Sequence, residues 1–207
     1  METPISSRRE ALVKGAALGL TGVLGMVAIA QPSMAATDQD RDAAILNAAI
    51  DLENQAIWAY GVAAGKLSKT EVGKTVLALA LRNQADHKKH LAALSSVVKS
   101  LGKTPSPAKS SYDLSSYIKA GEGNLDSDAN IAKLALALEI DAVLAYGDAF
   151  SKLKTPAILA AAGTIAPDES AHATAIRAVF KTLDPSIEYV PAAFINAETR
   201  KDWILKV

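Results

Sequence analysis

Apolar residues recur every three or four positions in four long stretches of the chain, the spacing that places them on one face of an α-helix. Beyond residue 35, no stretch alternates between apolar and polar residues long enough to indicate a β-sheet. The apolar stripe of the first stretch is Ile45, Ala49, Leu52, Ala56, Ala59 and Ala63. The pattern therefore predicts an all-α protein with helices over residues 40–66, 70–101, 126–153 and 155–183.

Residues that favour helix ends flank these stretches. Asp38 and Asp40 are candidate caps for the first helix, and Thr155 followed by Pro156 marks the start of the fourth. The second helix is expected to stop at Gly102, because glycine readily takes the left-handed conformation that closes a helix. The candidate caps of the third helix are Asp126, Ser127 and Asp128.

The lengths of the connections indicate the topology. Only a few residues join the first helix to the second and the third to the fourth, so each pair should form an antiparallel hairpin. The segment 102–125 between the hairpins is long and contains Pro105 and Pro107. Fully extended it would reach roughly 80 Å, whereas a bundle helix is roughly 42 Å long. We therefore expect residues 36–184 to form an antiparallel four-helix bundle with a long crossover between its second and third helices.

The two predicted hairpins repeat each other in sequence. The phrase A-x-x-L-E-x-x-A-x-x-A-Y-G occurs at residues 49–61 and again at 135–147, and the segment 76–101 matches 158–183. The pairs that superimpose are Glu53 with Glu139, Tyr60 with Tyr146, Asp86 with Asp168, and His90 with His172. One carboxylate on each first helix and one histidine on each second helix is the distribution expected of a metal site inside a bundle.

The chemistry of these side chains supports a metal site. Glu169 and His172 are three residues apart and therefore lie on one face of a helix, where both can bind one ion. Glu53 and Glu139 lie on otherwise apolar faces, where an unpaired carboxylate would cost several kcal/mol. Carboxylate oxygens with imidazole suit iron or manganese, and the absence of cysteine excludes thiolate sites.

These motifs resemble those of the ferritin-like proteins with two carboxylate-bridged metal ions. In that family two helices each contribute one Glu and the other two each contribute Glu-x-x-His, with a crossover between the hairpins. The resemblance covers most of residues 40–184, and the tail is similar to that of exported, desiccation-related members. It implies a dinuclear iron or manganese site, with the ligands Glu53, His87, His90, Glu139, Glu169 and His172.

His87 departs from the family pattern. It stands where the second helix should carry the partner of Glu169, so the motif reads His87-Lys-Lys-His90. One reading keeps His87 as a ligand, which leaves three Glu against two divalent ions and favours an added anion. A second reading turns His87 away and lets Asp86 supply the oxygen. A third is a site with a single metal ion or none.

Several other residues carry alternatives. Tyr60 and Tyr146 lie two turns beyond each Glu, where they either donate to the site or pack, and packing is favoured. Pro167 lies inside the fourth helix and predicts a kink, either to aim Glu169 and His172 inward or to adjust helix packing. The tail 185–207 is so apolar that it should dock on the bundle or on another subunit.

Residues 1–35 are typical of an export signal. Arg8 and Arg9 form a twin arginine, and an uncharged stretch from Gly15 to Ala30 leads to a small-residue cleavage site at Ala35. An uncleaved anchor is the alternative, but spanning a bilayer needs roughly 20 apolar residues. The sequence therefore predicts a periplasmic or otherwise exported protein with no stable membrane insertion after removal of the signal.

Removing residues 1–35 changes the composition in two useful ways. The whole chain has 22 basic and 22 acidic residues, and the signal holds three basic and two acidic ones, which leaves 19 against 20. That balance gives no reason to expect a nucleic acid as partner. All three methionines also lie in residues 1–35, so the remaining chain could not bind haem through methionine.

Two classes of function follow from the sequence. The first is an exported redox metalloprotein, a non-haem dimetal oxidoreductase, that reacts with dioxygen or peroxide during oxidative stress. The second is a non-catalytic stress-related or desiccation-related bundle with a degraded or single-metal site. A homodimer is compatible with the sequence.

Overall fold

The computed structural model describes residues 37–207, and every regular element within them is a helix. The predicted export signal lies outside the described residues. None of the described helices combines the length and apolar character that a membrane span requires. The helices are α2 (Asp38–Ala64), α3 (Glu71–Ser100), α4 (Ser115–Lys119), α5 (Asp128–Lys152), α6 (Pro156–Leu183) and α7 (Arg200–Trp203).

The helix ends are set by short local motifs. Thr37, rather than Asp38 or Asp40, caps α2, and Asp40 completes a capping box by accepting from the Thr37 backbone. Ser127 caps α5 by accepting from the amide of Asn130, and Gly102 follows α3 with a positive φ of 71°. The four long predicted helices are therefore confirmed to within about two residues at each end.

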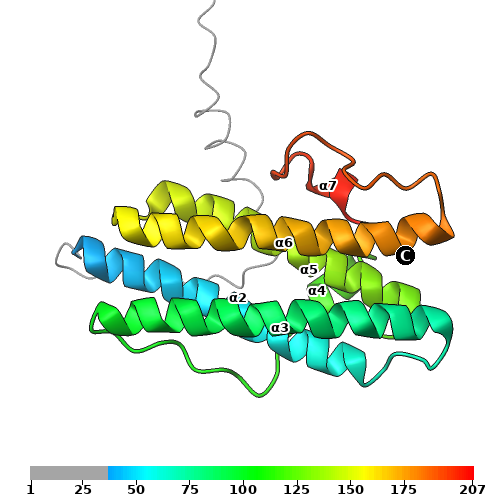
Figure 1. The fold of residues 1–207 in the computed structure, drawn as a ribbon, viewed down its shortest axis with the longest axis horizontal. Helices are drawn as coiled ribbons and strands as arrows, with labels where there is room; N and C mark the ends of the chain where they lie inside the picture. The colour runs from blue at the N-terminus through cyan, green and yellow to red at the C-terminus, as the bar shows by residue number, and fades with distance from the viewer. Residues whose placement is uncertain (1–36) are drawn as a thin grey trace, which may run out of the picture.

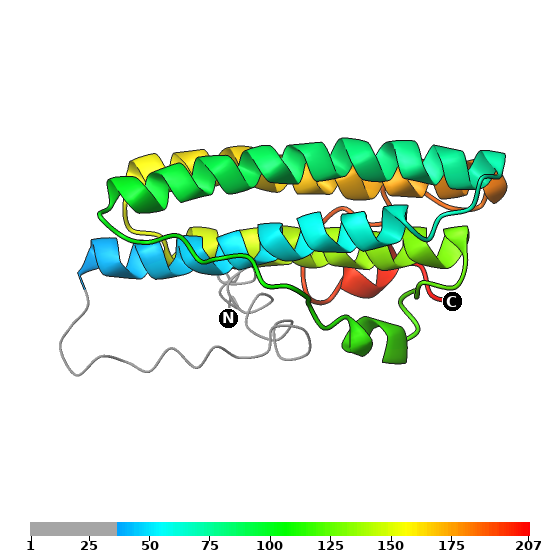
Figure 2. The same cartoon turned by 90° about the horizontal axis from the view of Figure 1, so that it is seen from below.

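The four long helices form the expected bundle of two hairpins. Figure 1 shows α2 antiparallel to α3 and α5 antiparallel to α6, with α3 and α5 running in the same direction. The crossover 101–127 returns along α2, and it contains the short helix α4 that the sequence did not predict. In Figure 2, α3 and α6 form one layer, α2 and α5 the other, and both α4 and α7 lie beyond α2 and α5.

The interior of the bundle has two apolar clusters with polar residues between them. One cluster includes Leu136, Ile140 and Ile176, and the other includes Ile50 and Val98. Among the described residues, the largest fully buried side chains include three that are polar and belong to the predicted site: His87, Glu53 and Glu169. The apolar clusters therefore enclose the predicted site from both ends of the bundle.

The C-terminal tail lies against the bundle through buried contacts. Trp203 and Ile204 are 4% and 6% exposed, and the buried Arg177 of α6 donates to the carbonyl of Trp203 at 2.5 Å. Arg200 reaches two carboxylates on other elements, Glu122 at 2.7 Å and Asp141 at 2.5 Å. The tail is thus held by an ion-pair cluster as well as by apolar packing.

Replacing Arg200 by alanine should lower the free energy of unfolding by about 3 kcal/mol, because it leaves Glu122 and Asp141 without their shared cation. Chemical denaturation followed by circular dichroism would measure the change. Lys201→Ala is the control, since this neighbour is 77% exposed and pairs only with Asp202 at the surface. A loss equal to that of the control would mean that the cluster contributes nothing to docking of the tail.

Candidate metal centre

Three glutamates from three different helices meet at the middle of the bundle. Glu53 of α2 and Glu139 of α5 are each 2% exposed, and Glu169 of α6 is fully buried. An isolated buried carboxylate is costly, so such a group requires positive partners close by.

His90 of α3 and His172 of α6 face the two oxygens of Glu169. The Nδ1 atom of His90 lies 3.0 Å from Oε1 of Glu169, and Nδ1 of His172 lies 3.3 Å from its Oε2. Each histidine also approaches one of the other glutamates, His90 with Glu53 at 3.7 Å and His172 with Glu139 at 3.4 Å. The arrangement therefore has two similar halves that share Glu169.

His87 points into the centre between these halves. Its Nδ1 lies 2.8 Å from Glu53 and 3.8 Å from Glu169, and its Nε2 lies 3.3 Å from Glu139. The reading in which His87 turns away from the site is therefore wrong. Because its two ring nitrogens face different glutamates, the side chain touches both halves at once.

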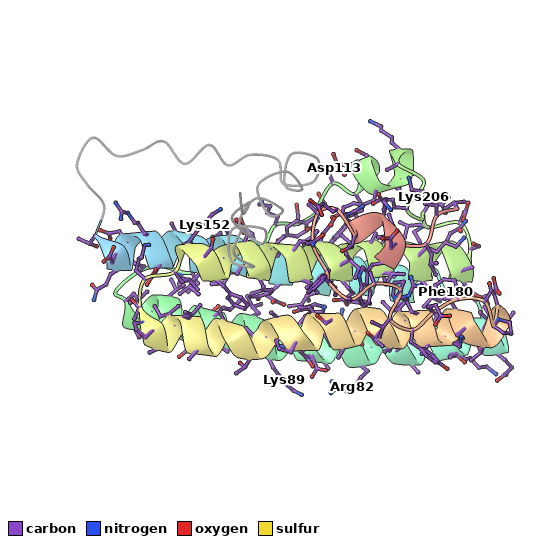
Figure 3. The ribbon with its side chains drawn as sticks, turned by 90° about the horizontal axis from the view of Figure 1, so that it is seen from above. Arg82, Lys89, Asp113, Lys152, Phe180 and Lys206 are labelled. Atoms are coloured by element: carbon purple, nitrogen blue, oxygen red, sulfur yellow. The ribbon has the colours of Figure 1, made fainter. Side chains whose placement is uncertain are left out.

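Asp86 and Asp168 lie on the outer side of the histidines. Asp168 is 3.2 Å from Nε2 of His90, and Asp86 is 3.6 Å from Nε2 of His172. Asp86 also pairs with Arg82 and Lys89, two side chains that project away from the other helices in Figure 3. Asp86 therefore does not replace His87 among the central groups, because it lies outside the histidines and pairs with two surface cations.

The two tyrosines of the repeat bind the glutamates of the opposite hairpin. Tyr146 donates to Glu53 at 2.5 Å, and Tyr60 donates to Glu139, so the prediction that both merely pack is wrong. Asn83, which sequence reasoning missed, donates to the hydroxyl of Tyr60 at 3.0 Å. The sequence does contain an indication of this role, because Asn83 precedes His87 by one helical turn and lies on the same face of α3.

Electrostatics favours the charged form of each histidine. Burial would lower the pKa of His87, but the charge of Glu139 and hydrogen bonds to the glutamates raise it to about 11. Burial also opposes protonation of His90 and His172, yet the close carboxylates, Glu169 beside His90 and Glu139 beside His172, raise their pKa values to about 9 and about 10. Because a metal needs the neutral imidazole, ion binding here would release protons.

The three carboxyl groups respond differently to the same environment. Burial would raise the pKa of Glu53 and of Glu139, but His87 and the other histidines outweigh burial and lower both. The pKa of Glu169 is raised, mainly because burial penalises its charge and the charge of Glu139 adds repulsion. Glu169 thus differs from the other two glutamates because the effect of burial outweighs that of its three histidine neighbours.

The unpaired atoms test whether these residues fit metal ions. Within residues 37–207, all the buried side-chain nitrogen and oxygen atoms that lack a well-oriented hydrogen bond belong to this centre, although several lie within ion-pair distance of one another. They are His90 Nδ1, Glu139 Oε2, both oxygens of Glu169, and both ring nitrogens of His172. Buried polar atoms almost always have well-oriented hydrogen bonds, so a cluster of atoms without them is compatible with bound ions.

The same residues form two overlapping groups whose ligand atoms lie within 4.8 Å of one another. These groups could hold metal ions, and oxygen with imidazole nitrogen is the donor set that iron and manganese accept. The structure thus brings together all six side chains predicted as ligands. The groups are Glu53, His87, His90 and Glu169, and His87, Glu139, Glu169 and His172.

Comparisons with known proteins agree with this architecture. Among solved structures, a conserved hypothetical protein from Mycobacterium tuberculosis is 22% identical, with a TM-score of 0.58, and the match covers 76% of this chain and 99% of that one. At this identity the likeness concerns the fold alone. No curated protein matches the chain. The family model described as a ferritin-like domain matches residues 41–182, well over half of the chain, and the chain therefore belongs to the ferritin-like family.

Proposed function

We propose that this protein is an exported metalloprotein that holds two iron or manganese ions in its bundle and reacts with dioxygen or peroxide. The observation that carries the proposal is the set of unpaired buried atoms, which divides into two halves that share Glu169. Such a division suits two ions rather than one. When bound, a pair of these ions supplies the reversible change of oxidation state that oxidation of a metal or an organic substrate needs.

The residues around the centre would have different roles in holding the ions and in shielding them. Glu53 with His90 and Glu139 with His172 would hold one ion each, while Glu169 offers one oxygen to each half. The hydroxyls of the two tyrosines occupy one oxygen of Glu53 and of Glu139 and leave the other directed toward the centre. The apolar clusters on both sides would limit the access of water from the two ends of the bundle.

A non-catalytic bundle is the second candidate, and His87 is the observation that favours it. As a cation between Glu53 and Glu139, His87 balances buried negative charge without any metal. A protein stabilised in this way could serve as a structural component during stress or desiccation.

Metal analysis separates the two candidates. Protein purified from its native export route should contain about two equivalents of iron or manganese, and Glu169→Ala should reduce that content at least about tenfold, because both halves lose a ligand. Glu198→Ala, which removes an exposed tail glutamate, is the control and should leave the metal content unchanged. Less than a tenth of an equivalent in the wild type, with no change in Glu169→Ala, would exclude the redox metalloprotein.

Redox activity needs its own measurement. After anaerobic loading with Fe(II), the wild type should consume dioxygen or peroxide in proportion to its bound iron, and Glu169→Ala should not. Full metal content without any consumption of oxidant would leave a metal-binding bundle and contradict the redox part of the proposal.

A further inference from the structure

An apolar pocket leads from the surface of the α2 and α5 layer to the candidate metal centre. It has a volume of about 70 Å³, and its lining extends from α4 and the crossover to the buried carboxylates. One water needs roughly 10–15 Å³ on this kind of measure, so the pocket has room for more than a few waters. The helix α4, which contributes Tyr117 to the lining, lies beyond the layer of α2 and α5 in Figure 2.

The walls of the pocket are mostly hydrocarbon, with Gln55 among their few polar side chains. Helices α2 and α5 form most of the lining, largely through alanine and leucine side chains that include Ala59, Ala135 and Leu138. The hydroxyls of the two lining tyrosines are already used, since Tyr60 donates to Glu139 and Tyr117 donates to Asp141 at 2.9 Å. An occupant of these walls would therefore be an apolar chain.

The inner end of the pocket is chemically different. Glu139 and Glu169 line it, are 2% and 0% exposed, and carry oxygens without a hydrogen-bond partner. Two divalent ions would bring four positive charges. Glu53, Glu139 and Glu169 supply only three negative charges, because His87 stands where the family pattern has a fourth carboxylate. The loaded centre would carry one positive charge and would attract a single negative group.

We propose that the pocket binds an aliphatic monocarboxylate, with the carboxylate at the metal centre and the chain along the seam between α2 and α5. The inference rests on the proposed metal centre and names the class of molecule that this centre takes. Along α5 the lining includes Ile131, eight residues before Glu139, and this separation corresponds to a rise of about 12 Å, comparable to the extended chain of decanoate.

The internal repeat provides a matched pair of variants for the test. Ala135 lines the pocket, whereas Ala49, its equivalent in the first hairpin, does not, and both are half-buried. Ala135→Leu should fill part of the pocket, and Ala49→Leu adds the same volume elsewhere. Val62→Phe narrows the pocket from α2 and serves as a second variant if Ala135→Leu does not fold.

Isothermal titration calorimetry of the Mn(II)-loaded protein would measure the binding affinities of decanoate, acetate and decanol in turn. Bound manganese would be determined in the same samples. Decanoate should bind at least about tenfold more tightly than either of the others, because acetate lacks the chain and decanol lacks the charge. Ala135→Leu and Val62→Phe should weaken the binding of decanoate at least about tenfold and leave the manganese content unchanged. Ala49→Leu should change neither the affinity for decanoate nor the manganese content.

Failure of this inference is distinguishable from failure of the proposed function. Full manganese content with decanoate no tighter than acetate, or with equal affinity in both alanine variants, would overturn the inference alone. Sedimentation that shows a dimer broken by Ala135→Leu, without decanoate binding, would assign the pocket to a second copy and also overturn it. A protein that binds no manganese would overturn the metal centre, and the inference with it.

Discussion

Replacing His87 by alanine should destabilise the metal-free protein by about 3–5 kcal/mol at neutral pH, the range for removing one partner of a buried ion pair. His87 is 2% exposed and lies between Glu53 and Glu139, which are equally buried. Without the imidazolium, these two carboxylates would face each other and Glu169 with less positive charge nearby. Urea unfolding in the presence of a chelator would measure the loss.

The loss of stability caused by His87→Ala should also become smaller as the pH rises. The pKa of His87 is raised to about 11 in the folded protein, against about 6.5 for an ordinary histidine. Its contribution is therefore complete below about pH 6.5 and is lost as the pH rises toward the folded pKa. The difference between wild type and His87→Ala should accordingly shrink between pH 7 and pH 10.

Lys88→Ala is the control for this measurement, because Lys88 is exposed on the same helix and contacts only Gln84 through its ammonium group. It should change the stability by less than about 0.5 kcal/mol. If His87→Ala lost no more than Lys88→Ala, His87 could not be the cation that balances Glu53 and Glu139.

Much of the fold could be predicted because the signals for helix ends are local. Ser127 caps α5 through its own neighbours, and Gly102 closes α3 with a positive φ, so both ends can be read from a few residues. The helix α4 was missed because it has only five residues and depends on distant packing. Its Tyr117 is buried and donates to Asp141 of α5, a contact that no local pattern reports.

The site was predictable along each helix but not across helices. The repeat located Glu53 and Tyr60 on one face of α2, because spacing along a single helix determines which side chains share a face. It could not show that Tyr60 donates to Glu139, since that bond depends on how far α5 is shifted along the bundle axis. The direction of His87 was open for the same reason: its surroundings come from three other helices.

Replacing His87 by glutamate should destabilise the metal-free protein but strengthen its binding of metal ions. In the metal-free protein, a fourth carboxylate would enter a buried centre that already holds Glu53, Glu139 and Glu169, and it would remove one cation. Stability should therefore fall by at least as much as in His87→Ala, unless the new carboxyl group takes up a proton. With two divalent ions bound, however, four carboxylates would balance four positive charges.

We therefore expect His87→Glu to bind Mn(II) at least about tenfold more tightly than the wild type, and to gain more in melting temperature when Mn(II) is added. His87→Gln is the matched control, because it is neutral and of similar size and should bring no gain. Equal Mn(II) affinity in the two variants would show that the charge of the side chain at position 87 does not affect ion binding. The glutamate variant should also lose its affinity for decanoate, since its own carboxylate would neutralise the positive charge that attracts one.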